Sequence, residues 1–265
     1  MILIGERING SFKDIAQAIR EKNKGPVQEW ARRQAGADYL DVNIGAVSKR
    51  PEDMAWLVEA VQVAVPTPIS VDSTNVEILK GGLKALDGRP VLINSTTADD
   101  RKLEQLIPLA VEYNASLIGV AMDERGSPQD VARRVENGAK IFAAAIEAGL
   151  TPDRIFLDPI LMPLKFMQAQ AKNVLETIQQ WTMLSDPPPH ISVGLSNICS
   201  KAAERSLITR TFLVMAMALG LDAAVCNVLD EELLNAIATA ELILNKEIYS
   251  DSYLQAFKMK AARPS

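Results

Sequence analysis

Eight short apolar runs alternate with helix-like segments along the whole chain, and this alternation limits the possible folds most strongly. The runs are residues 2–4, 39–44, 69–72, 91–94, 117–122, 155–158, 191–196 and 223–227. They are continuously apolar rather than alternating with polar residues, which is typical of parallel strands buried on both faces. The pattern therefore predicts an α/β fold built on a parallel sheet.

The segments between the runs carry apolar residues at helical spacing, for example between Met54 and Val65. Ser127 and Pro128 have the residue types of a cap and a first turn, which predicts a helix reaching about Ala148. Further helical patterns cover residues 207–219 and 231–244, and a short helix is expected within 251–259.

Eight strand–helix units in a chain of 265 residues predict a (β/α)8 TIM barrel that forms a single domain over residues 1–265. A doubly wound open sheet is the alternative. It is disfavoured because the early strands are not followed by the glycine fingerprint of a dinucleotide fold. The glycines of "KGGLKALDG" (80–88) are expected in a helix and the turn after it.

Composition excludes several classes of partner and chemistry. A net charge of −5 argues against nucleic acid and gives no basic surface for a membrane. No signal peptide or membrane-spanning stretch of about eighteen apolar residues is expected. Two cysteines indicate a reducing cytoplasm, and with the single His190 they provide no metal-ligand spacing, so no bound metal is expected. His190 is interpreted as structural.

Polar residues end most of the strand runs. In a (β/α)8 barrel the carboxyl ends of the strands surround the active site. The candidates at these ends are Glu6, Asn9, Asp41, Asn43, Asp72, Ser73, Asn94, Ser95, Asp158, Ser196 and Asn197. Some of them could instead cap the following helices, especially Ser73 and Ser95, and so could the neighbouring Thr74.

Asp72, Asn94, Asp158 and Asn197 are expected to point together into the barrel mouth. Carboxylates accept hydrogen bonds and amides both donate and accept them. Their motifs contain no cationic partner, so they suit a neutral ligand rich in N–H donors, such as a heterocycle with an aminopyrimidinone edge. No cluster of Lys, Arg or Gly follows the last two strands, which argues against a phosphate site. "RR" (32–33) is interpreted as solvated surface.

Six motifs on consecutive units resemble the pterin-binding barrel superfamily. They are "GERING" (5–10), "DVNIG" (41–45), "VDSTN" (71–75), "INST" (93–96), "DPILMP" (158–163) and "GLSN" (194–197). The chain is most similar to its methyltetrahydrofolate:corrinoid/iron–sulfur protein methyltransferases. The folate domain of cobalamin-dependent methionine synthase is similar at several motifs, and dihydropteroate synthase is a more distant relative. The resemblance runs from Met1 to about Lys258.

The resemblance implies a homodimer of barrels that binds methyltetrahydrofolate. Asp72, Asn94 and Asp158 would hold the pterin edge, and Asn197 would approach the nitrogen that carries the methyl group. The methyl acceptor would be a Co(I) corrinoid on a separate corrinoid or corrinoid/iron–sulfur protein. The sequence lacks a His-containing cobalamin motif, so no corrinoid of its own is expected.

The resemblance also implies that Gly194 and Ser196 shape the wall beside Asn197, and that Arg205 supports this site. The strand-end residues Glu6, Asn9, Asp41 and Asn43 complete the predicted substrate-binding set. The stretch from Met215 to Met217 is expected to pack in the core or in a dimer contact.

The methylated nitrogen is a poor leaving group unless it is protonated, and the motifs contain no histidine to act as the acid. Asn197 is therefore expected to hydrogen-bond to this nitrogen as charge develops. The proton would come from solvent through a water held by Asp158 or Asp72. Transfer in either direction would use the same pocket, for acetyl-CoA synthesis or for a demethylation pathway. Dihydropteroate synthesis and non-catalytic folate binding are the alternatives.

Overall fold

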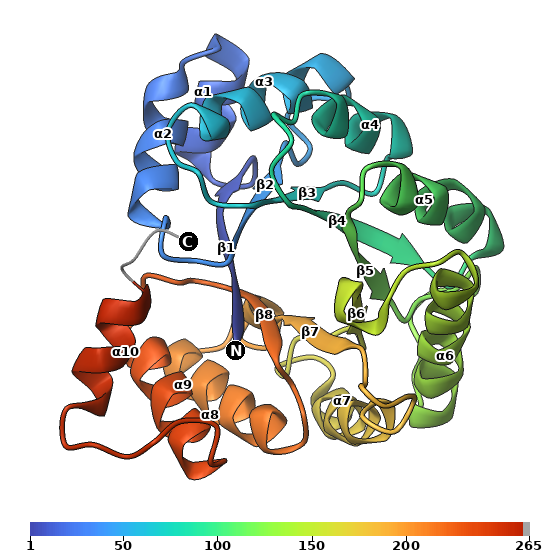
Figure 1. Ribbon diagram of the computed structural model, residues 1–265, viewed down its shortest axis with the longest axis vertical. Helices are drawn as coiled ribbons and strands as arrows, with labels where there is room; N and C mark the ends of the chain where they lie inside the picture. Colours follow the sequence, from blue (N-terminus) through green and yellow to red (C-terminus); the bar gives the residue numbers. More distant parts are fainter. Residues whose placement is uncertain (262–265) are drawn as a thin grey trace.

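A computed structural model describes the backbone of residues 1–261 and the side chains of residues 1–257. Eight parallel strands close into one barrel in the order of the chain, and the helices surround them (Figure 1). The predicted (β/α)8 fold is confirmed. The strands are β1 (Ile2–Asn9), β2 (Tyr39–Asn43), β3 (Ile69–Asp72), β4 (Val91–Thr97), β5 (Ser116–Val120), β6 (Ile155–Asp158), β7 (His190–Gly194) and β8 (Ala223–Cys226).

The helices follow the predicted order, with two helices in the connection after β1. That connection is divided because Lys22 adopts a left-handed φ of 55° and the Asn23 side chain caps the second helix. The α-helices are α1 (Lys13–Glu21), α2 (Lys24–Arg33), α3 (Pro51–Gln62), α4 (Val76–Lys84), α5 (Asp100–Glu112), α6 (Val131–Glu147), α7 (Gln168–Trp181), α8 (Arg205–Ala218), α9 (Glu231–Ile243) and α10 (Tyr253–Ala261). The 3₁₀ turns η1 (Pro152–Arg154) and η2 (Leu195–Asn197) flank β6 and β7.

The predicted start of α6 is wrong. Ser127 and Pro128 lie in the loop before the helix, and Asp130 caps it by accepting the backbone N–H of Arg133 at 2.8 Å. A Ser-Pro pair suits a helix start locally, but here the loop continues for several more residues. The predicted end at about Ala148 is confirmed, since Ala148 is the C-cap.

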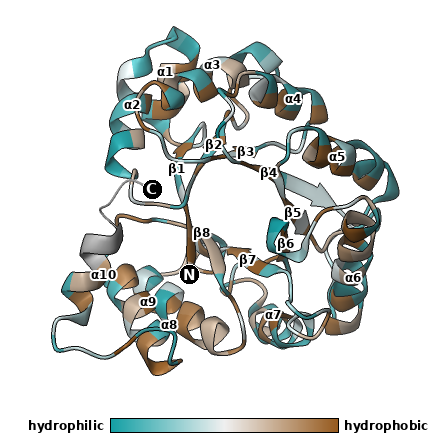
Figure 2. Ribbon diagram, viewed as in Figure 1, coloured by the Kyte–Doolittle hydropathy of each residue, from teal (hydrophilic) through white to brown (hydrophobic). Residues whose placement is uncertain are grey.

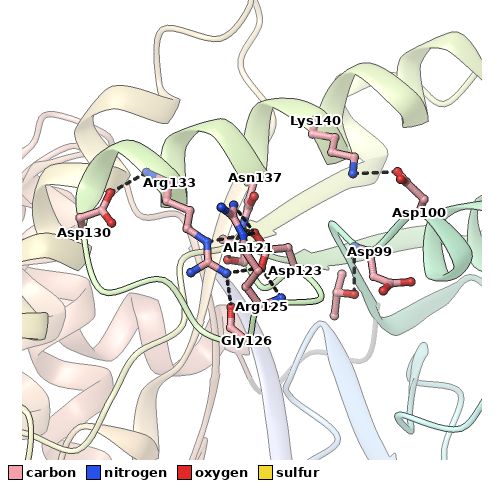
Figure 3. Close-up of polar contacts among 11 residues, drawn as sticks. Asp99, Asp100, Ala121, Asp123, Arg125, Gly126, Asp130, Arg133, Asn137 and Lys140 are labelled. Carbon is pink, nitrogen blue, oxygen red and sulfur yellow. Dashed lines mark hydrogen bonds and ion pairs between the residues drawn. The ribbon is translucent and has the colours of Figure 1, made fainter.

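A cluster of charged side chains holds this β5–α6 loop in place (Figure 3). The Asp123 carboxylate accepts hydrogen bonds from the side chains of Arg125, Arg133 and Asn137. The two guanidinium groups hold the pKa of Asp123 well below its usual range. The Asp123 carboxylate is therefore an anion, and its hydrogen bonds to Arg133 and Asn137 hold the loop against α6.

The serines and threonine predicted as caps do not cap helices. Asn75 caps α4, and its side chain accepts the backbone N–H of Glu77 at 2.9 Å. Asp99 caps α5. Ser95 lies inside β4, because that strand continues to Thr97.

The side chains that fill the barrel interior determine which strand-end residues face the barrel mouth. A small apolar cluster of Ile4, Leu92, Ile118, Phe156 and Ala223 fills the interior, while a larger core lies between strands and helices. Figure 2 shows hydrophobic residues along β1 and both hydrophobic and hydrophilic residues on the surrounding helices. Side chains two places apart share a face of a strand. Glu6, Asn94 and Asp158 each follow an interior residue by two places, so they enter the barrel mouth.

Within residues 1–261, none of the helices combines the length and the apolar character needed to cross a membrane.

Candidate functional site

A pocket of about 720 Å³ lies at the mouth formed by the carboxyl ends of the strands. All residues of the predicted substrate-binding set except Asn43 line it, whereas the strand-end candidates Ser73 and Ser95 do not. The members of the set that line it are Glu6, Asn9, Asp41, Asp72, Asn94, Asp158, Gly194, Ser196, Asn197 and Arg205. The barrel therefore brings together residues from the first, second, third, fourth, sixth and seventh strands and their loops.

Two carboxyl groups on neighbouring strands form the buried floor of the pocket. Asp41 accepts hydrogen bonds from Ser70 Oγ at 2.7 Å and from Asn94 Nδ2 at 3.1 Å. Burial raises the pKa of Asp41 and of Asp72, and the nearby charge of Asp72 raises that of Asp41 further. This pair therefore keeps a proton at a higher pH than an isolated aspartate does.

Asn43 lies behind Asp72 and does not line the pocket. Its Nδ2 donates to Asp72 Oδ2 at 2.6 Å, and its Oδ1 accepts the backbone N–H of Gly45 at 2.6 Å. Both ends of the amide are therefore used within the protein. Asn43 therefore orients the Asp72 carboxylate, and its contact with substrate stays a prediction.

Asp158 contributes a third carboxylate from the end of β6. Burial raises its pKa to about 6, although backbone N–H groups of Ile160 and Gly194 favour the charged form. The Ile160 N–H donates to Asp158 Oδ1 at 2.7 Å. Ile160 adopts a left-handed φ of 64°, an unfavourable conformation for a β-branched residue, and the backbone around it positions this N–H. Asp158 can thus exchange a proton near neutral pH.

Asn197 lies in η2, directly after β7, and it does not cap α8, which begins after Glu204. A Cβ atom at Gly194 would lie 2.9 Å from Asn197 Nδ2, so only glycine lets the amide approach the strand end this closely. Asn197 is exposed, and its side chain makes no hydrogen bond within residues 1–257. Its amide is therefore available to a ligand.

Glu6 joins β1 to this wall of the pocket. Its Oε1 accepts a hydrogen bond from Ser196 Oγ at 2.7 Å. Burial raises the pKa of Glu6, and the charge of Asp41 acts in the same direction, while Ser196 and Arg205 lower it. Ser196 is thereby held by a contact within the protein, which fits its predicted role as part of the wall.

Arg7 and Arg33 form a basic cluster on one side of the pocket that was not predicted from the sequence. Arg7 contacts the rings of Phe12 and Trp30, and Arg33 contacts the ring of Trp30. Arg205, the arginine predicted in the site, also lines the pocket. Arg33 is exposed, as predicted for "RR" (32–33), and it also lines the pocket. Only the tertiary structure reveals this cluster, because its residues come from two elements, β1 and α2. In addition, a register shift between Gly5 and Ile8 interrupts the regular pattern of β1. The one available signal was that Arg7 follows Glu6 in "GERING".

The remaining reactive residue types lie outside this pocket. His190 begins β7 at the opposite end of the barrel, where its Nδ1 contacts Asp222 Oδ2 at 2.6 Å. Cys199 and Cys226 are buried free thiols, and burial raises the pKa of Cys226. Across the described residues no group of three His, Cys, Asp or Glu side chains could hold a metal ion.

Comparisons with known sequences give relatives over most or all of the chain. Residues 10–227 match the family described as "Pterin binding enzyme". The chain is 31% identical over 269 residues to the methylcorrinoid:tetrahydrofolate methyltransferase of Eubacterium limosum, covering 100% of this chain and 98% of that protein. It is 27% identical over 240 residues to methionine synthase of Mycobacterium leprae, covering 85% of this chain but 20% of that protein.

Solved structures of dihydropteroate synthases share the fold. The enzyme from Thermus thermophilus superposes with a TM-score of 0.62 at 20% identity and 94% coverage of both chains. The enzyme from Xanthomonas albilineans gives a TM-score of 0.64 at 16% identity, covering 94% of this chain and 93% of that one. At these identities the likeness supports the barrel and carries no statement about the reaction.

Proposed function

The chain belongs to the pterin-binding enzyme family, and from this premise we propose that it is a methyltransferase acting between 5-methyltetrahydrofolate and the cobalt of a separate corrinoid protein. The full-length relative from Eubacterium limosum, whose name states this chemistry, supports the proposal. The pocket supports it independently, because the carboxyl groups of Glu6, Asp41, Asp72 and Asp158 and the amides of Asn94 and Asn197 surround one cavity. This convergence of strand ends is the observation that carries the proposal.

The pterin edge of folate fits the floor of the pocket. Its amino group and ring N–H groups are donors, and Asp72 and Asp158 offer carboxylate acceptors. Asn94 can both donate and accept beside them. Charge-assisted bonds of this kind are worth about 1.5–3 kcal/mol each. A heterocycle without these donors would leave the carboxylates unpaired, so the floor would select against it.

We propose that methyl transfer runs from the methylated corrinoid to tetrahydrofolate. The name of the Eubacterium limosum relative favours this direction. The nitrogen lone pair of tetrahydrofolate forms the new N–CH3 bond, and the electron pair of the Co–C bond stays on cobalt, which becomes Co(I). The nitrogen also loses its proton, so the site must accept one proton in each turnover.

Asn197 and Asp158 are the residues proposed to act on the reacting nitrogen. The free amide of Asn197 hydrogen-bonds to it and stabilises the charge that develops there in the transition state. Asp158 has a pKa raised to about 6, and through a bound water it takes up the released proton. The reverse reaction would use the same two residues, with Asp158 supplying the proton.

The position of Asn197 also fits a methyl donor carried on another protein. Asn197 is exposed at the mouth, beside the half-buried Gly194 and Ser196. A corrinoid is a bulky group, and an open mouth lets it reach a nitrogen held against these residues. The corrinoid protein is therefore the proposed partner, and the barrel needs no nucleophilic side chain of its own.

We also propose that the protein is a homodimer whose contact includes α8. Leu207, Val214 and Met215 recur at helical spacing on this helix and are exposed, with 57%, 37% and 51% of their surface accessible. Met217 is buried, so it packs in the core as predicted. An apolar stripe on one outer helix is typical of a surface covered by another subunit. The cytoplasmic location stays a prediction that the two free cysteines favour.

An assay with methylcobalamin and tetrahydrofolate tests the proposed reaction directly. We expect 5-methyltetrahydrofolate to form at a rate that depends on the protein, and Co(I) to appear in the visible spectrum in equal amount. Folate binding without transfer to or from free cobalamin or any corrinoid protein would contradict the reaction. Formation of dihydropteroate from a pterin pyrophosphate and p-aminobenzoate would instead support the alternative synthesis.

A further inference from the structure

Arg7 is held rigidly between two aromatic rings on the basic side of the pocket. Its Cζ lies 4.0 Å from the ring centroid of Phe12 and 4.0 Å from that of Trp30. Its Nη2 donates to both oxygens of Asp14 at 2.8 Å, and Trp30 Nε1 donates to the same carboxylate at 2.7 Å. Packing and hydrogen bonds therefore fix the orientation of this guanidinium before any ligand arrives.

One nitrogen of Arg7 is left without a partner. Its Nη1 is buried and makes no hydrogen bond within residues 1–257. An unpaired charged donor is unfavourable, and the two flanking rings offset only part of that cost through cation–π contacts. Other atoms of Arg7 line the pocket, so its positive charge favours an anionic group that enters there.

Arg33 adds a second positive charge next to Arg7. Its Cζ lies 4.1 Å from the Trp30 ring, and the side chain forms no ion pair with any described residue. It is exposed and lines the same pocket. Trp30 therefore supports both guanidinium groups, one nearly buried and one open to solvent.

The pocket thus has opposite charge on two sides. Asp41, Asp72 and Asp158 form the floor, and the two arginines lie on the wall beside β1 and α2. A ligand matching both would carry N–H donors at one end and carboxylates at the other. Tetrahydrofolate has this polarity, with a pterin at one end and glutamate at the other.

We propose that Arg7 and Arg33 form a subsite for the glutamate carboxylates of the folate, and that it favours folates with a poly-γ-glutamate tail. This inference rests on the proposed function, since it takes the pterin to be in the floor. Arg7 binds the first glutamate with the part of its guanidinium that lines the pocket. Arg33, nearer solvent, binds carboxylates further along the tail.

The test compares three ligands in the absence of any corrinoid protein. They are tetrahydrofolate monoglutamate, tetrahydrofolate triglutamate and a tetrahydropterin without the benzoylglutamate tail, with dissociation constants measured by calorimetry. The wild-type chain is expected to bind the triglutamate about fivefold tighter than the monoglutamate, the effect of an exposed ion pair. Arg33→Gln removes that gain. Arg32→Gln is the matched control, because Arg32 is exposed on the same helix and does not line the pocket.

Arg7→Lys tests the inner contact, because it keeps the charge but removes the planar fork. Binding of the monoglutamate is expected to weaken about tenfold, as for a lost charged hydrogen bond, while binding of the tail-free pterin stays unchanged. A thermal unfolding curve checks that this variant is folded. If this variant is unfolded, the comparison of Arg33→Gln with Arg32→Gln still tests whether the subsite binds the glutamate tail.

Three results would overturn the subsite. The first is an equal loss of triglutamate affinity in Arg32→Gln and Arg33→Gln, and the second is a wild-type protein that binds both folates equally. The third is an Arg33→Gln variant that binds every folate normally but transfers methyl groups poorly with the corrinoid protein. The last result would assign the arginines to the partner. If the tail-free pterin fails to bind the wild-type protein, the pterin floor itself is wrong, and the proposed function fails separately.

Discussion

Asp158→Asn is expected to stabilise the ligand-free protein and to weaken folate binding. The Asp158 carboxyl has a pKa raised from 3.8 to about 6 because burial disfavours its charged form. A difference of about two pKa units corresponds to about 3 kcal/mol. At neutral pH the ionised carboxylate therefore lowers the free energy of unfolding by up to about 3 kcal/mol. Asparagine removes the charge and can still accept the Ile160 N–H.

The direction of the pH dependence follows from the two pKa values. Between pH 3.8 and about 6 the folded chain binds a proton at Asp158 and the unfolded chain does not. The contribution of this group to the free energy of unfolding therefore rises as the pH falls from 7 towards 4. The variant lacks this contribution. The stability difference between variant and wild type should be largest at pH 7 and above, and should shrink towards pH 4.

Urea unfolding between pH 4 and pH 8 measures this difference. Asp153→Asn is the control, because Asp153 is exposed in η1 at the opposite end of β6. It removes the same charge without a buried site. In parallel, the dissociation constant for tetrahydrofolate should rise at least about tenfold in Asp158→Asn. The reasoning is refuted if the stability difference is independent of pH, or if the variant is less stable than wild type at pH 7.

Further predictions concern catalysis, binding and assembly. Asn197→Ala should slow methyl transfer by about a hundredfold or more in rapid-mixing experiments, because a transition-state hydrogen bond is lost; near wild-type transfer would contradict this role. Asp72→Asn should weaken folate binding about tenfold in calorimetry, since a charge-assisted bond becomes a neutral one, and an unchanged affinity would rule out its contact with the pterin. Met215→Glu should convert a dimer into a monomer in light scattering, because it places a charge in the apolar stripe of α8; a wild-type chain that is already monomeric would remove the proposed interface.

Local patterns in the sequence were sufficient to predict the fold and much of the pocket. Strands buried on both faces give continuous apolar runs, and eight such runs alternating with helices have few arrangements. Asn94 and Asp158 could be placed at the mouth because each ends a predicted strand, and the carboxyl ends of barrel strands surround the active site. These rules depend on neighbours along the chain, so they can be applied to the sequence directly.

Tertiary structure decided which polar residues face the pocket and which only support it. Asn43 and Asp72 both end strands in similar motifs, yet the first bonds to the second and the second faces the cavity. The start of α6 likewise depended on a loop held by Asp123, a contact between residues that are not neighbours in sequence.

The basic side of the pocket shows this difference most clearly. Arg7 belongs to β1 and Arg33 ends α2, and Trp30 brings their guanidinium groups together. Arg33 has no local pattern that separates it from an ordinary surface residue, and the signal for Arg7 was only its place after Glu6 in "GERING". The sequence by itself determined the barrel and the positions of its strand ends, because these follow from periodicity. Only folding decided where the opposite charges of the pocket meet, because that depends on contacts between segments distant in the chain.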